Sequence, residues 1–186
     1  NTVDVDCNGK LDLFIGRVSG TIDRHEEDGR SANGMPRFRF LTERWEEIEI
    51  IGGVAGGDGA VARPSLHGAN TLAFADVDAD GDPELYWGDF FEPGLLRIDN
   101  VGSCAQPNLH SSAPVQFPQG TPLLTSGYNA PTFADTDGDG DLDLVMGVIG
   151  GAFGPSRTSI DNLYLVEQTA KGQFVTRTSR LIPTID

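Results

Sequence analysis

One acidic, glycine-centred motif occurs three times in the chain, and this repeat limits the available folds more than any other feature. Each copy reads Asp-x-Asp-x-[Asp/Asn]-Gly-x-x-[Asp/Glu] and is followed by a short, mostly apolar run and a glycine. The copies span residues 4–16, 76–88 and 135–147, so their starts lie 72 and 59 residues apart. Repetition at such periods indicates one supersecondary unit that is used several times.

The similarity between the copies continues on both sides of the motif. Upstream, residues 70–75 mirror residues 129–134. Downstream, each motif is followed by a loop, a β-like run, a turn and a further run around an aromatic residue. In one of these last runs, Phe38 and Phe40 alternate with arginines, which is the period of a strand and not of a helix. Each unit therefore predicts four short strands, with the acidic loop between the first two.

Four short strands in about 60 residues match the size of a propeller blade. We therefore expect an all-β fold of about three blades, each of four antiparallel strands. Because a closed propeller has about 4–8 blades, the chain would be a partial propeller or a fragment of a larger one. The first expected blade, truncated at its start, is residues 1–44, and an insertion or linker follows at residues 45–69. The second blade is residues 70–127, and the third blade, with a lead into a further one, is residues 128–186. Residues 45–51 suggest an additional strand.

The oxygen donors in each motif are spaced as Ca²⁺ requires, because this ion takes about 6–8 oxygen ligands. Side chains at motif positions 1, 3 and 5 converge in a tight loop, and the glycine at position 6 permits the sharp turn. Position 7 offers its backbone carbonyl, and position 9 returns a further carboxylate. The predicted ligands for up to three Ca²⁺ ions are Asp4, Asp6, Asn8, Lys10, Asp12, Asp76, Asp78, Asp80, Asp82, Glu84, Asp135, Asp137, Asp139, Asp141 and Asp143.

Electrostatics favours the same interpretation. The three nine-residue motifs hold 13 of the 28 acidic residues, and crowded carboxylates resist ordering without a cation. A solvated Asp/Gly turn without metal is the alternative, and it would have to occur three times at matching offsets. Mg²⁺ fits less well, because it prefers fewer protein ligands in strict octahedral geometry. An EF-hand is excluded, because its bidentate glutamate at position 12 is replaced here by an apolar strand residue.

With these features the chain resembles the FG-GAP/VCBS repeat family, which includes the β-propeller of integrin α subunits. The resemblance rests on the repeated motif and on the lead-in residues 74–76 and 133–135, and it covers nearly the whole chain apart from residues 45–69. It implies that each loop joins two strands of one blade and holds structural Ca²⁺. Glu84 departs from the family pattern in length and Asn8 in charge. Family members are typically extracellular, periplasmic or surface proteins that serve adhesion, ligand binding or assembly.

Net charge and cysteine content limit the cellular compartments and the classes of partner that we expect for this chain. A formal net charge of −15 opposes binding to nucleic acid and to anionic membranes. No apolar run approaches the ~20 residues of a membrane-spanning helix, so we expect no membrane insertion. Cys7 and Cys104 allow either one disulfide or two free thiols. A disulfide would agree with the extracytoplasmic location (secreted, cell surface or periplasmic) that we expect for a calcium-loaded acidic protein.

The sequence predicts a non-enzyme. His25, His67 and His110 are isolated, and the chain has no H-E-x-x-H, G-x-S-x-G or P-loop motif. We expect a calcium-binding structural or assembly subunit of a larger extracytoplasmic protein or complex, contacting a protein partner or remaining propeller blades.

Two alternatives remain open. One is an adhesin-like or lectin-like module that binds a protein or a glycan through its long loops, and the other is an accessory domain of a secreted enzyme. The candidate binding loops are residues 45–69, 89–94 and 148–160, where Phe90 and Phe91 would be either anchors or core residues.

Overall fold

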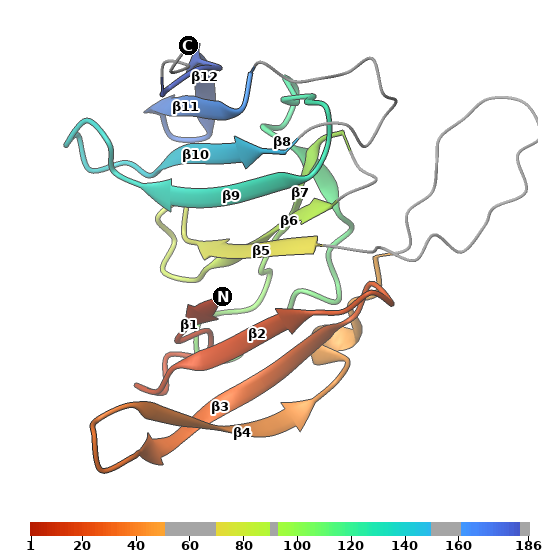
Figure 1. Cartoon of the computed structure of the whole chain (residues 1–186), viewed down its shortest axis with the longest axis vertical. Helices are drawn as coiled ribbons and strands as arrows, with labels where there is room; N and C mark the ends of the chain where they lie inside the picture. The colour runs from red at the N-terminus through yellow and green to blue at the C-terminus, as the bar shows by residue number, and fades with distance from the viewer. Residues whose placement is uncertain (51–69, 90–92, 150–160, 183–186) are drawn as a thin grey trace, which may run out of the picture.

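The computed structural model describes residues 1–50, 70–89, 93–149 and 161–182, and these form an all-β molecule of three stacked sheets (Figure 1). Each sheet is antiparallel and has four strands in sequence order, so every sheet is a meander. This confirms the predicted all-β class and the four-stranded units. The described residues form an open stack and not a closed ring (Figure 1).

The strands of the three sheets fall where the repeat places them. The first sheet consists of β1 (Thr2–Val3), β2 (Asp12–Gly16), β3 (Ile22–Arg30) and β4 (Pro36–Thr42). The second consists of β5 (Asn70–Ala75), β6 (Glu84–Asp89), β7 (Leu95–Ile98) and β8 (Val115–Phe117). The third consists of β9 (Asn129–Ala134), β10 (Asp143–Val148), β11 (Leu163–Ala170) and β12 (Gln173–Thr178). The acidic loops are the β1–β2, β5–β6 and β9–β10 connections, and they lie at one edge of the stack, at the left of Figure 1.

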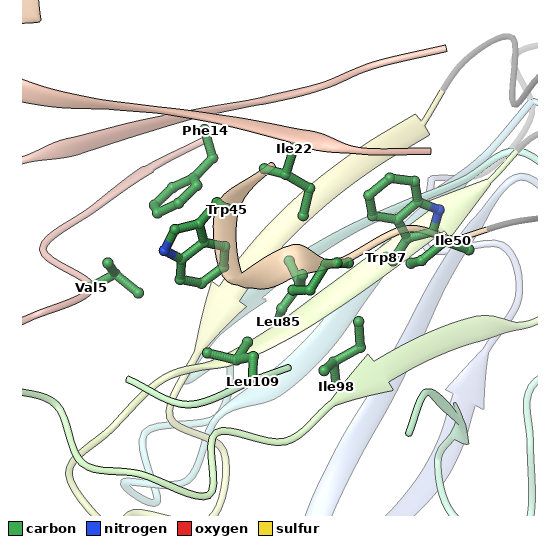
Figure 2. Packing of buried hydrophobic residues seen from close by; sticks show 10 residues of the cluster. Val5, Phe14, Ile22, Trp45, Ile50, Leu85, Trp87, Ile98 and Leu109 are labelled. Atoms are coloured by element: carbon green, nitrogen blue, oxygen red, sulfur yellow. The ribbon is translucent and has the colours of Figure 1, made fainter. Parts of the chain in front are cut away.

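Strand β6 shows how the sheets share their cores. Successive strand residues point to opposite faces, so Leu85 and Trp87 face the first sheet while Tyr86 faces the third. All three side chains are fully buried. Figure 2 shows Leu85 and Trp87 among the apolar residues of the first cluster. The cluster between the second and third sheets includes Phe117, Leu144, Met146 and Val166. The middle sheet is therefore covered on both faces.

Residues 45–50 are not a strand, so that part of the predicted additional strand is wrong. Trp45–Glu47 form a short 3₁₀ turn (η1), in which Glu46 and Glu47 have φ angles of 54° and 53°. The turn aims the Glu46 carboxylate at the β7–β8 connection, where it accepts a hydrogen bond from the Leu109 amide at 3.0 Å. Trp45 is buried, with its ring centroid 4.7 Å from that of Phe14 (Figure 2). The segment therefore closes the first core cluster.

The glycine that ends each motif has a packing role at two sheet junctions. A Cβ on Gly16 would lie 1.7 Å from Oδ1 of Asn70, the first residue of the next sheet. A Cβ on Gly88 would lie 1.8 Å from the backbone oxygen of Asn129, which begins the third sheet. At Gly147 the nearest atom would be 3.8 Å away, in the same sheet. At Gly88 the clash is with backbone, so only glycine permits the observed approach of the two sheets, whereas at Gly16 the Asn70 side chain would have to move.

A disulfide joins Cys7 and Cys104, with their Cα atoms 5.5 Å apart. Of the two alternatives that the sequence left open, the structure has the bonded one. The bond connects the first acidic loop to the β7–β8 connection of the second sheet. None of the helices among the described residues is long and apolar enough to cross a membrane.

Candidate metal sites in the acidic loops

The three acidic loops share a turn in which the first carboxylate accepts two backbone N–H groups. Asp4 accepts from the amides of motif positions 5 and 6 at 3.0 and 2.9 Å, and Asp76 does so at the same two distances. Asp135 accepts from positions 4 and 6 at 2.7 and 3.2 Å. The position-6 residues Gly9, Gly81 and Gly140 have φ angles of 82°, 100° and 98°, which L side chains adopt only with strain. The repeated glycine is thus required by the turn.

The carboxylate at position 9 is buried in every loop and closes it. Asp12, Glu84 and Asp143 each accept a hydrogen bond from the backbone N–H of position 2, at 3.2, 3.2 and 3.0 Å. A carboxylate can accept about four hydrogen bonds, so this contact leaves capacity for a further ligand. The loops differ in what contacts the other oxygen of this position-9 carboxylate.

In the second loop the five acidic side chains form two groups of three that share Glu84. One oxygen from each of Asp76, Asp78 and Glu84 lies within 4.8 Å of the others, and the same holds for Asp80, Asp82 and Glu84. The Oδ1 atoms of Asp78 and Asp82 are buried and have no hydrogen-bond partner. The residue Asp82 is only 7% exposed. Buried polar atoms without partners are costly, so these oxygens point to a bound cation.

Burial and mutual repulsion alter the acidity of the second loop. Burial raises the pKa of Glu84 to about 8, and the negative charges of the neighbouring aspartates act in the same direction. Burial and the charge of Asp80 raise the pKa of Asp82 to about 6. Both shifts mean that the loop resists carrying its full negative charge. A dication would remove that resistance.

The third loop is more exposed and brings fewer carboxylates together. Oxygens of Asp135, Asp137 and Asp139 lie within 4.8 Å of one another, and all three residues are exposed. Asp143 is not in this group. Burial acts to raise its pKa, but hydrogen bonds from Thr136 and the Gln168 backbone outweigh burial and lower it.

Gln168, on β11, links the third loop to the second, and the sequence analysis did not identify it. Its backbone N–H donates to Oδ1 of Asp143 at 2.9 Å, while its side-chain amide donates to the Val77 carbonyl at 3.3 Å. Its side-chain oxygen accepts from the Gly172 amide at 2.7 Å. A glutamine between two sheets, 1% exposed, is a structural bridge between neighbouring loops.

The first loop has a different partner. Oxygens of Asp4, Asp6 and Asp12 lie within 4.8 Å of one another. The Arg24 guanidinium contacts two of these residues, through Nη2 to Asp6 Oδ2 at 2.5 Å and through Nε to Asp12 Oδ1 at 2.8 Å. Burial raises the pKa of Asp12, although Arg24 acts against it. Nothing in the motif itself indicated this arginine.

The remaining sequence-predicted residues are placed as follows. The Lys10 ammonium forms an ion pair with Glu26 at 3.1 Å, and Asn8 donates to the same carboxylate at 3.1 Å. The Asp141 carboxylate does not join the cluster of the third loop. Unlike the position-7 side chain in the other loops, that of Asp82 is buried within its loop and lies with the other carboxylates.

The acidic clusters of the second and third loops could hold a metal ion, and their donors would suit Ca²⁺. Both offer only oxygen donors, and Ca²⁺ is bound by carboxylates and carbonyls in flexible geometry. In the first loop the donors are the same in kind, but a protein cation already contacts two of them.

Comparisons with protein-family models, curated proteins and solved structures found no match to this chain. The resemblance to the FG-GAP/VCBS family therefore rests only on the repeated motif and its lead-in residues. Of the candidate binding loops, residues 51–69, 90–92 and 150–160, with Phe90 and Phe91, lie outside the described residues. The described histidines have structural neighbours: His110 contacts Glu46 at 2.9 Å, and the rings of His25 and Phe40 lie 5.3 Å apart.

Proposed function

We propose that the chain is a Ca²⁺-binding module of β-propeller repeats, with a non-catalytic structural or assembly role in a larger extracytoplasmic protein or complex. The observation that carries the proposal is the second acidic loop. Its five carboxylates form two oxygen triads that share Glu84, and two buried oxygens, on Asp78 and Asp82, lack a hydrogen-bond donor in the described part of the chain. Such a loop has the donors for a divalent ion and is poorly stable without one.

The sheet architecture supports the propeller part of the proposal. Each unit is a four-stranded meander with the acidic loop between its first two strands, which is the arrangement that the family resemblance implies. The units pack face to face over shared apolar clusters, with β6 contributing to both. Propeller blades pack in this manner around a central axis.

The disulfide supports an extracytoplasmic location. Disulfides persist in oxidising compartments and are rare in the cytosol. Calcium at about 10⁻⁴–10⁻³ M is the working range of extracellular calcium modules, so exposed loops of modest affinity would be filled there. The bond between Cys7 and Cys104 is consistent with such a compartment.

Thermal unfolding with calcium and with a chelator tests the proposal. A ligand that binds only the native state at 100 times its Kd adds about 2.7 kcal/mol of stability. For a chain of this size that corresponds to a rise of about 5–10 °C in the unfolding midpoint for each site. Asp78→Asn should remove the part of the calcium-dependent rise that comes from the second loop. An unchanged midpoint in wild-type protein would reject structural calcium.

A further inference from the structure

The first acidic loop differs from the other two in its charge balance. It contains three carboxylates, at positions 1, 3 and 9, whereas each of the other loops contains five. The Arg24 guanidinium bridges positions 3 and 9, the carboxylates Asp6 and Asp12. In the second loop the residues at these positions, Asp78 and Glu84, belong to one oxygen cluster as Asp6 and Asp12 do, but no guanidinium of the described residues contacts them. The guanidinium therefore stands between the two carboxylates that a metal ion would otherwise share.

The contacts of Arg24 are specific to the first sheet. Arg24, Arg97 and Leu165 occupy the same register position, opposite the third residue of the second strand in their sheets. Arg97 has the same chemistry as Arg24, but it turns to Asp99, with its Nε 2.6 Å from Oδ1. Among the described residues, no lysine or arginine forms an ion pair with the five carboxylates of the second loop. An arginine at this position of the third strand therefore does not by itself contact the acidic loop of its sheet.

Other contacts hold the first loop in place without a metal. Position 5 is Asn8, whose amide donates to Glu26, and the same carboxylate pairs with Lys10. The Arg24 side chain is 13% exposed, so the loop already holds a largely buried cation beside its carboxylates. At position 4 the disulfide from Cys7 ties the loop to the second sheet. These bonds supply positive charge and restraint to the first loop, and they leave one buried oxygen, Oδ1 of Asp6, without a hydrogen-bond partner among the described residues.

We propose that the first loop is a metal-independent copy of the motif, in which the Arg24 guanidinium takes the place of the divalent ion. This inference rests on the proposed function only for its comparison with the other loops. It predicts that calcium orders the second and third loops, and that the junction between the first and second sheets keeps its structure when calcium is removed. Arg24 is then the residue that determines which loops bind calcium.

The first test compares two matched substitutions. Asp4→Asn and Asp76→Asn alter the same turn, because both aspartates accept hydrogen bonds from positions 5 and 6. Calcium is counted by native mass spectrometry and isothermal titration on the decalcified, oxidised chain. We expect Asp4→Asn to bind as many ions as wild type and Asp76→Asn to bind one fewer. Loss of an ion in Asp4→Asn overturns the inference.

The second test removes the arginine. Arg24→Gln should bind one ion more than wild type, while the control Arg97→Gln should bind the same number. A folded Arg24→Gln protein with an unchanged count overturns the inference, and if this variant does not fold, Asp4→Asn decides. A wild-type chain that binds no calcium would refute the proposed function instead. In that case the number of calcium ions bound by Arg24→Gln still tests the further inference. One bound ion supports the role of Arg24, and no bound ion rejects it.

Discussion

The metal-free chain should lose stability as the pH rises from about 5 to about 8, because of Glu84. This side chain is 4% exposed, and burial raises its pKa from 4.5 to about 8. Between these values the folded state holds a proton that the unfolded state has released. Stability falls with pH wherever the folded state binds more protons, so the sign of the effect is destabilising.

The size of the effect follows from the two pKa values. At 1.36 kcal/mol for each pH unit, the interval from 4.5 to about 8 corresponds to about 5 kcal/mol of unfolding free energy. Asp82, with a pKa of about 6, acts in the same direction. Asp143 and Glu167 have lowered pKa values, so they change the unfolding free energy only at pH values below this window. Saturating calcium should abolish the fall, because the bound ion replaces the proton.

Urea unfolding of the decalcified chain at several pH values measures this free energy. Glu84→Gln is the informative variant, because the amide imitates the protonated acid and still accepts the hydrogen bond from Val77. Its stability should fall by about 5 kcal/mol less than that of wild type, and only the smaller contribution of Asp82 should remain. Glu167→Gln, which alters a half-buried partner of Arg177, is the control, and its stability should fall as that of wild type does. Wild-type stability that stays level across the window, or an equal fall in Glu84→Gln, would refute the reasoning.

Three further changes test the packing around the loops. Gly88→Ala should cost about 1–3 kcal/mol by urea unfolding, because its Cβ would overlap the neighbouring sheet, whereas Gly147→Ala should be tolerated; equal costs would contradict this. Gln168→Ala should cost about 1–3 kcal/mol, because it removes the side-chain donor to the buried Val77 carbonyl and the acceptor of the Gly172 amide; an unchanged midpoint would reject the bridge. Reducing the Cys7–Cys104 bond, which closes 97 residues, should cost about 4–5 kcal/mol while leaving the calcium count unchanged.

The sequence predicted the strands well because the repeat fixes them locally. The acidic turn requires glycine at position 6, and strand residues follow directly, so β2, β6 and β10 begin at position 9 in all three units. Alternation in residues 36–40 likewise predicted β4 (Pro36–Thr42). Such features depend on neighbours within about ten residues, which a single sequence displays.

Features that depend on distant contacts were missed. The 45–50 segment has an apolar pattern that suits a strand, but Glu46 bonds to Leu109 and His110, far along the chain, and this favours a tight turn. Arg24 lies 12 residues or more from the carboxylates it contacts, so no motif spacing reveals it. The sequence shows the glycine that ends each motif. It does not show that the neighbouring sheet lies so close to the second of these glycines that a side chain would not fit.

A crystal structure of the chain grown in calcium, with anomalous data to identify the ion, tests the central claim most directly. The account predicts a calcium peak within the second loop, bonded to oxygens of Asp76, Asp78, Asp80 and Glu84 at about 2.3–2.6 Å. A second loop that held only water at millimolar calcium, with its carboxylates turned apart, would contradict the account.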